Sequence, residues 1–182
     1  MWAVSGRHMN LENVSVYHDH NWGRWNWGDD FGWEWGCFVS RQAGGSFVAA
    51  RTTNRAHTKR SELKLFVDLE GERRTLSGAT IDLQFEGSMS VTRRLPGAMA
   101  TLHQDMAQPN LPRIVNLRAN DGFDTVDLRF TAREALQLIA ADPIAANGFT
   151  FIHEIAGEFN YSAKLGERRL TGSGLGIFEY VN

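Results

Sequence analysis

The chain has 182 residues, a formal net charge of −2 and a single cysteine. This length fits one globular domain, and the near-neutral charge gives no electrostatic reason to expect binding to nucleic acid. A single cysteine excludes an intrachain disulfide, and no run of about 20 apolar residues predicts a membrane-spanning helix. From the length we expect one domain over 1–182. Because the N-terminus also lacks a leader pattern, we expect a cytoplasmic setting.

The first 35 residues hold all six tryptophans, namely Trp2, Trp22, Trp25, Trp27, Trp33 and Trp35. Tryptophan buries a large ring and also has an N–H group that needs a partner, so this clustering is typical of a packed wall or a binding surface.

The segment 17–23 reads Tyr-His-Asp-His-Asn-Trp-Gly. In an extended strand His18, His20 and Trp22 share one face, whereas Tyr17 and Asp19 share the other. Such polar groups are costly to bury unless they satisfy one another or a ligand. The segment therefore predicts either a catalytic or binding site, or a structural network that closes the end of a barrel.

A metal site is a further alternative for this segment, because His-x-His places two imidazoles on one face of a strand. The possible third ligands are Glu34, His103 and His153, and the spacing selects none of them. We expect neither a metal nor any other cofactor.

The next strand is predicted over 31–39, where Phe31, Trp33, Trp35, Cys37 and Val39 alternate on one face. Glu34 lies on the opposite face, between the two indoles in sequence. A carboxyl group near indoles is poorly solvated, which predicts a raised pKa and makes Glu34 a candidate acid.

The rest of the chain alternates with period two and is punctuated by turns such as Glu86-Gly87. Strands are predicted over 46–53, 61–69, 79–86, 87–94, 113–119, 124–130, 148–163 and 168–181. One short helix is predicted over 131–141, because Thr131-Ala-Arg-Glu134 has the capping-box pattern. About ten strands and one helix favour an all-β, closed or nearly closed antiparallel barrel, with a two-sheet sandwich as the alternative.

Four residues outside these motifs also receive an interpretation. His153 is expected to be a satisfied core histidine on the face of strand 148–163 that also carries Phe159. His57 and His103 lie in polar, turn-rich stretches and are expected at the surface. Glu179, in the last strand, is expected to pair with an arginine such as Arg51 or Arg129.

The heptapeptide 17–23, the two Trp-x-Trp-Gly runs after it and the closing Gly-Leu-Gly-Ile-Phe-Glu-Tyr of 174–180 resemble the second domain of the carotenoid 1,2-hydratase (hydroxyneurosporene synthase) and AttH-like family. The resemblance implies a lipocalin-like barrel, the second of two tandem barrels in that family. It matches His20 and Trp22 to the family's His-x-Trp. Where the family has Tyr-x-Asp this chain has Phe47-Val48-Ala49, which leaves Asp19 and Glu34 as the remaining acids.

Taken with these residues, the resemblance implies a cofactor-independent hydratase, isomerase or cyclase that acts on an apolar terpenoid, polyene or polyketide-like molecule in a Trp-lined barrel. Its predicted catalytic residues are His18, Asp19, His20 and Glu34. The predicted substrate-binding residues are Tyr17, Trp22, Trp25, Trp27, Trp33 and Trp35. The alternatives are a non-catalytic carrier of a lipophilic molecule and a half that assembles with a second barrel domain or as a homodimer.

Overall fold

The computed structural model describes residues 2–4, 7–9, 29–41, 44–95, 110–141 and 149–182. A short antiparallel pair joins β1 (Trp2–Val4) and β2 (Arg7–Met9), and ten further strands form one sheet. These are β3 (Gly32–Ser40), β4 (Ser46–Thr53), β5 (Lys64–Leu69), β6 (Glu72–Ser77), β7 (Ile81–Met89), β8 (Arg93–Leu95), β9 (Leu111–Asn120), β10 (Thr125–Ala141), β11 (Phe149–Leu165) and β12 (Arg168–Val181).

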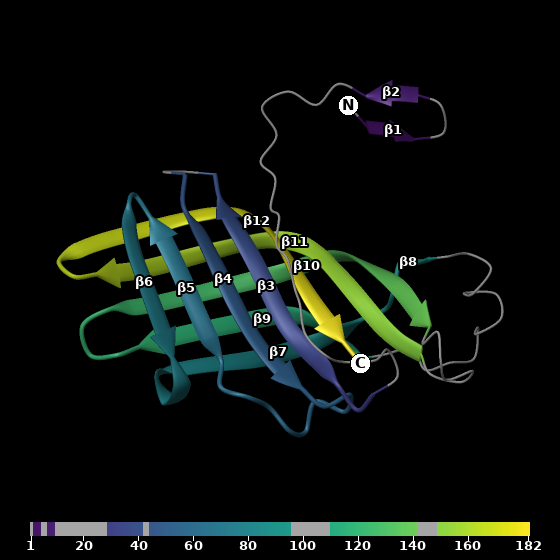
Figure 1. The fold of residues 1–182 in the computed structure, drawn as a ribbon. Coiled ribbons are helices and arrows are strands. Elements are labelled where there is room, and N and C mark those ends of the chain that lie inside the picture. The colour runs from purple at the N-terminus through teal and green to yellow at the C-terminus, as the bar shows by residue number, and fades with distance from the viewer. Residues whose placement is uncertain (1, 5–6, 10–28, 42–43, 96–109, 142–148) are drawn as a thin grey trace.

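The large sheet is almost wholly antiparallel, in the order β6-β5-β4-β3-β12-β11-β10-β9-β7, with β8 pairing in parallel with part of β10. It curls strongly, as Figure 1 shows. Arg74 of β6 reaches Asp124 in the turn before β10, with 2.9 Å between Nε and Oδ2. Within the described residues, β6 and β7 end the path without pairing with each other. The all-β prediction is confirmed, and the sheet is a curled half-barrel.

Phenylalanine rings fill the middle of the inner face. Phe38, Phe47, Phe130, Phe159 and Phe178 are fully buried there. Phe38 contacts Phe130 and Phe159 edge to face, at centroid distances of 5.5 and 5.6 Å. The predicted alternation of β11 is confirmed, because His153, Ile155, Phe159 and Tyr161 all face this core.

Glycines make room for these rings on the neighbouring strands. Gly36 lies opposite Phe178, Gly176 lies opposite Phe38, and Gly174 lies opposite Phe159. A Cβ atom at Gly36 would lie 2.7 Å from the ring of Phe38, so any larger residue would displace that ring. A glycine beside an aromatic ring in the adjacent strand is a known device for curving a sheet.

The helix predicted over 131–141 is wrong, because these residues continue β10. β10 pairs with β11 along its whole length and has a bulge between Ala132 and Glu134. Ala135, Gln137 and Ile139 face inward after the bulge, whereas Leu136 and Leu138 are half-buried on the other side. Because β10 carries apolar residues on both faces here, its sequence does not show the alternation typical of a strand. Pairing with the neighbouring strands outweighs the local helical preference of these residues.

The predicted turn at Glu86-Gly87 is also wrong. Gly87 has a φ of 63° but lies inside β7, which runs on to Met89. Of the predicted strand over 87–94, only the last part forms a strand of its own, β8. The described helical structure amounts to one 3-10 turn, Gly78–Thr80, and none of it has the length and apolar character to span a membrane.

Candidate active site at the polar belt

Three of the predicted site residues lie on β3, on two different faces. Glu34 points to the inner face and is 1% exposed. Trp33 and Trp35 point outward, so the expectation that they line the interior is wrong. The other predicted residues lie outside the described residues: Tyr17, His18, Asp19, His20, Trp22, Trp25 and Trp27.

Glu34 belongs to a row of polar residues that crosses six strands at one level of the inner face. The register pairs each member with the next across the sheet: Arg51 of β4, Glu34 of β3, Tyr180 of β12, His153 of β11, Gln137 of β10 and Arg94 of β8. We call this row the polar belt. It lies within two residues of the ends of β3, β4 and β12, at one end of the half-barrel.

Glu34 is held as a carboxylate at the centre of an ion-pair network. Arg51 donates from Nε to Oε2 at 2.5 Å, His57 Nδ1 lies 2.9 Å from Oε1, and Arg60 Nε lies 3.7 Å from Oε1. Burial alone would raise the pKa of Glu34, but the hydrogen bond from His57 and the charges of the two arginines outweigh it. The pKa is therefore lowered, which corrects the expectation of a protonated acid.

His57 reaches the belt from the turn that follows β4. Its backbone has a φ of 55°, a region that L residues adopt rarely and that costs about 1–3 kcal/mol. Asn54 stabilises the turn, because its Oδ1 accepts from the N–H groups of Thr58 and Lys59 at 2.9 Å each. The His57 ring stacks on Tyr180, with 3.8 Å between centroids and 9° between planes.

The hydrogen bond to Glu34 fixes the tautomer of neutral His57. A carboxylate can only accept, so Nδ1 carries the hydrogen and Nε2 carries the lone pair. Nε2 is buried and has no hydrogen-bond partner in the part of the chain that the structure describes. His57 is 7% exposed, so the expectation of a surface histidine is wrong.

Beside it on the belt, His153 is locked as a neutral imidazole. Its Nδ1 lies 2.8 Å from the carbonyl oxygen of Tyr180, which can only accept, so Nε2 must accept from Gln137 Nε2 at 2.9 Å. Burial lowers the pKa of His153 to about 4. This confirms the interpretation of His153 as a satisfied core histidine. Burial, and then the nearby charge of Glu34, raises the pKa of Tyr180.

The row of inner residues next to the belt is apolar. It contains Ala49, Gly36, Phe178, Ile155 and Ala135. Phe47 and Ala49, which stand where the resembled family has Tyr-x-Asp, both belong to the buried core. The belt is thus a polar edge on an apolar interior, the composition typical of small-molecule sites.

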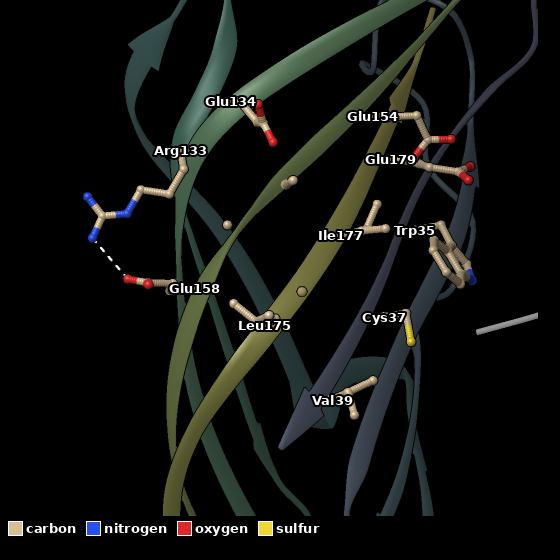
Figure 2. Close-up of a pocket in the computed structure, with 13 residues that line it drawn as sticks. Trp35, Cys37, Val39, Arg133, Glu134, Glu154, Glu158, Leu175, Ile177 and Glu179 are labelled. Carbon is tan, nitrogen blue, oxygen red and sulfur yellow. Dashed lines mark hydrogen bonds and ion pairs between the residues drawn. The ribbon is translucent and has the colours of Figure 1, made fainter. Parts of the chain in front are cut away.

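A separate groove of about 640 Å³ lies on the outer face, over β3, β12, β11 and β10. Figure 2 shows Trp35, Cys37, Val39, Leu175 and Ile177 along its floor. Acidic residues stand around that floor: Glu134, Glu154, Glu158 and Glu179. Glu179 accepts a hydrogen bond from Trp33 Nε1 at 2.6 Å. Arg51 pairs with Glu34 and Arg129 with Glu86, so the predicted pairing of Glu179 with either of these two arginines is wrong.

Sequence reasoning missed His57, Arg51, Tyr180, Gln137 and Arg94. Arg51 had a readable signal, because it follows Phe47 and Ala49 at a spacing of two and so shares their apolar face. Gln137 was hidden by the helix assignment. His57 had no local signal, because only the fold brings its turn over Tyr180. Within the described residues no three His, Cys, Asp or Glu side chains group as metal ligands.

Comparisons with known proteins bear on the fold. No protein-family model matches the chain, and no curated protein does. An AttH-like protein from Nitrosomonas europaea has a similar structure, with a TM-score of 0.50 and 11% identity over 82% of this chain and 38% of that protein. Kievitone hydratase from Nectria haematococca matches with a TM-score of 0.41 and 14% identity, over 84% of this chain and 40% of that enzyme.

The chain therefore spans well under half the length of both proteins. At such identity the likeness to the AttH-like protein shows a shared fold. The lipocalin-like fold expected for this sequence is confirmed, in the form of a curled half-barrel.

Proposed function

We propose that this chain is a cofactor-independent acid–base enzyme that acts on an apolar small molecule at the polar belt. The observation that carries the proposal is the buried Glu34–His57 pair, with 2.9 Å between Oε1 and Nδ1. A carboxylate that holds Nδ1–H of a histidine orients the ring and stabilises its protonated form. Nε2, to which no described residue is hydrogen-bonded, is then available to take a proton from a substrate or a water molecule.

The surroundings of this pair suit an apolar substrate. The half-buried ring of Phe85, which contacts Phe178 and Tyr180, offers an apolar surface beside the belt for a terpenoid, polyene or polyketide-like body. Tyr17, Trp22, Trp25 and Trp27 remain the predicted substrate-binding residues of the segment before β3. His18, Asp19 and His20 of the same segment remain the predicted source of the acid.

The proposed reaction is hydration, isomerisation or cyclisation of a carbon–carbon double bond. In hydration, His57 Nε2 takes a proton from water as the water oxygen bonds to one alkene carbon. An acid donates a proton to the other carbon and is reprotonated from His57, so the balance is the addition of one water. In isomerisation, the proton removed from one carbon returns at another. Neither route consumes an oxidant or a reductant.

The test uses isotopically labelled water and a panel of polyenes, terpenoid alcohols and unsaturated ketones. Wild-type protein in H₂¹⁸O or D₂O is expected to yield a product that has gained labelled oxygen or deuterium, measured by mass spectrometry. His57→Gln removes the base and is expected to lower incorporation by about 10²-fold or more.

Thr58→Ala is the matched control, because it alters the same turn at an exposed side chain. It is expected to keep wild-type incorporation. Circular dichroism of both variants establishes that they fold. Wild-type incorporation in a folded His57→Gln variant would contradict the proposed role of His57.

A second candidate role, assembly with another barrel domain, is favoured by the outer groove. Leu175 and Ile177 are large apolar residues that are 54% and 45% exposed in its floor. Single apolar side chains at a surface are ordinary, whereas neighbours on one sheet face are typical of an interface. Leu175→Glu is expected to abolish self-association in sedimentation velocity, and a wild-type chain that is monomeric at all concentrations would contradict self-assembly.

A further inference from the structure

Three side-chain nitrogen atoms of the inner face are buried without a hydrogen-bond partner among the described residues: Nη2 of Arg51, Nε2 of His57 and Nη2 of Arg94. Of the two guanidinium nitrogens, that of Arg51 is in ion-pair contact with Glu34. An unmade hydrogen bond in the interior destabilises the folded state, and more so for a charged group. Buried polar atoms without a partner are rare in folded proteins and are a signature of sites that a ligand completes.

The unpartnered nitrogens of His57 and Arg94 belong to one region of the belt. Arg94 lies beside Gln137 in the β8–β10 register, and Gln137 donates to His153. His57 and Arg94 are both close enough to the His153 imidazole to contribute to its lowered pKa, and His153 lies between them on the belt. His57 and Arg94 therefore approach the same part of the interior from opposite sides.

The described belt also carries more positive than negative charge. Arg51 and Arg94 are its two guanidinium groups, Arg60 reaches Glu34 from outside the belt, and Glu34 is the one carboxylate among the described belt residues. Glu34 already pairs with Arg51 and Arg60. Among the belt residues, Arg94 is therefore the guanidinium group that has no carboxylate partner in the described ion pairs.

We infer that the belt binds the anionic oxygen of an apolar ligand, with Arg94 as its main partner and the hydrocarbon body against the half-buried ring of Phe85, which contacts Tyr180. The ligand class is an apolar carboxylate, or a carbonyl compound whose oxygen becomes an enolate during the reaction. A guanidinium donates two parallel hydrogen bonds to such oxygens. Burial strengthens this attraction relative to water.

This inference rests on the proposed function and specifies the class of its substrate. A double bond conjugated to a carbonyl accepts water at one carbon while negative charge moves to the carbonyl oxygen. His57 then supplies the base at one end, and Arg94 stabilises the oxygen at the other. Such a substrate needs a weaker acid than an isolated double bond.

The test compares decanoate, 1-decanol and methyl decanoate as ligands of the full chain by isothermal titration calorimetry at pH 7. Wild-type protein is expected to bind decanoate roughly tenfold to a hundredfold more tightly than the two neutral ligands. Arg94→Met is expected to remove this preference. Arg93→Met is the matched control, because Arg93 is the exposed neighbour on the same short strand, and it is expected to keep the preference.

His57→Gln separates this inference from the proposed function. It is expected to keep a preference for decanoate while losing label incorporation, so the two ideas can fail independently. If Arg94→Met does not fold, Arg94→Lys takes its place and is expected to show a reduced preference. The inference is overturned if wild-type protein binds decanoate no more tightly than 1-decanol or not at all, or if the variant at Arg94 keeps the full preference.

Discussion

The inner face of the half-barrel contains two regions built from the same strands. In the middle, Phe38 packs against Phe159 and Phe178 packs against Phe85, and glycines lie opposite Phe38, Phe159 and Phe178. One row further along, Glu34 and Tyr180 belong to the polar belt. Phe178 and Tyr180 are separated by two positions on β12, yet one packs in the core and the other stacks on a histidine. We expect the first region to determine stability, and the second to determine binding and proton transfer.

The largest expected effect is in the aromatic middle. Phe159→Ala removes a fully buried ring that contacts Phe38, Phe47 and Tyr161. It is expected to lower the free energy of unfolding by about 4 kcal/mol in urea titrations. Phe123→Ala, at a side chain that is 80% exposed, is the control and is expected to change it by less than about 0.5 kcal/mol. Equal effects would contradict the described core.

A smaller loss is expected at the belt. Glu34→Ala leaves Arg51 and His57 buried without their carboxylate and is expected to cost about 3 kcal/mol of unfolding free energy. The matched control is Glu158→Ala, which removes the exposed partner of Arg133 at 2.9 Å. Exposed pairs contribute about 0–1 kcal/mol. If the variant at Glu34 is as stable as the control, the ion-pair network does not form.

The belt should also give stability a pH dependence that the aromatic middle lacks. The folded pKa of His153 is about 4, below its ordinary value of 6.5. Between these values the unfolded chain binds a proton that the folded chain does not, so stability falls as pH drops from 6.5 to 4. The expected loss is about 2–3 kcal/mol. Below pH 4.5, Glu34 adds to it, because its lowered pKa stabilises the fold only while the carboxylate is charged.

Urea titrations of wild type and His153→Gln over pH 4–7 measure this dependence. The variant is expected to show a flatter profile than wild type through the window from pH 6.5 to 4. Parallel profiles would mean that His153 titrates normally and is not buried.

Much of the fold could be read from the sequence, because alternation within single strands is local. Segment 46–53 coincides with β4, and the alternation of β11 places His153 and Phe159 inward as predicted. The helix over 131–141 failed because its capping box and alanines are local signals that pairing with β11 outweighs.

The site was less predictable than the fold. Glu34 was found from its position between two indoles, but the direction of its pKa was missed because Arg51, His57 and Arg60 come from other segments. The polar belt depends on which strands lie side by side. The strand order β4-β3-β12-β11-β10 cannot be derived from the periodicity of single strands.

The most direct test of the central claim, that His57 is the reactive group of the belt, is long-range ¹H–¹⁵N NMR of the histidine rings as decanoate is added. We predict that free His57 carries its hydrogen on Nδ1, and that the Nε2 resonance of His57 shifts on titration while His153 stays unchanged. A hydrogen on Nε2 of neutral His57, or a His57 signal that does not respond while decanoate binds, would contradict the account.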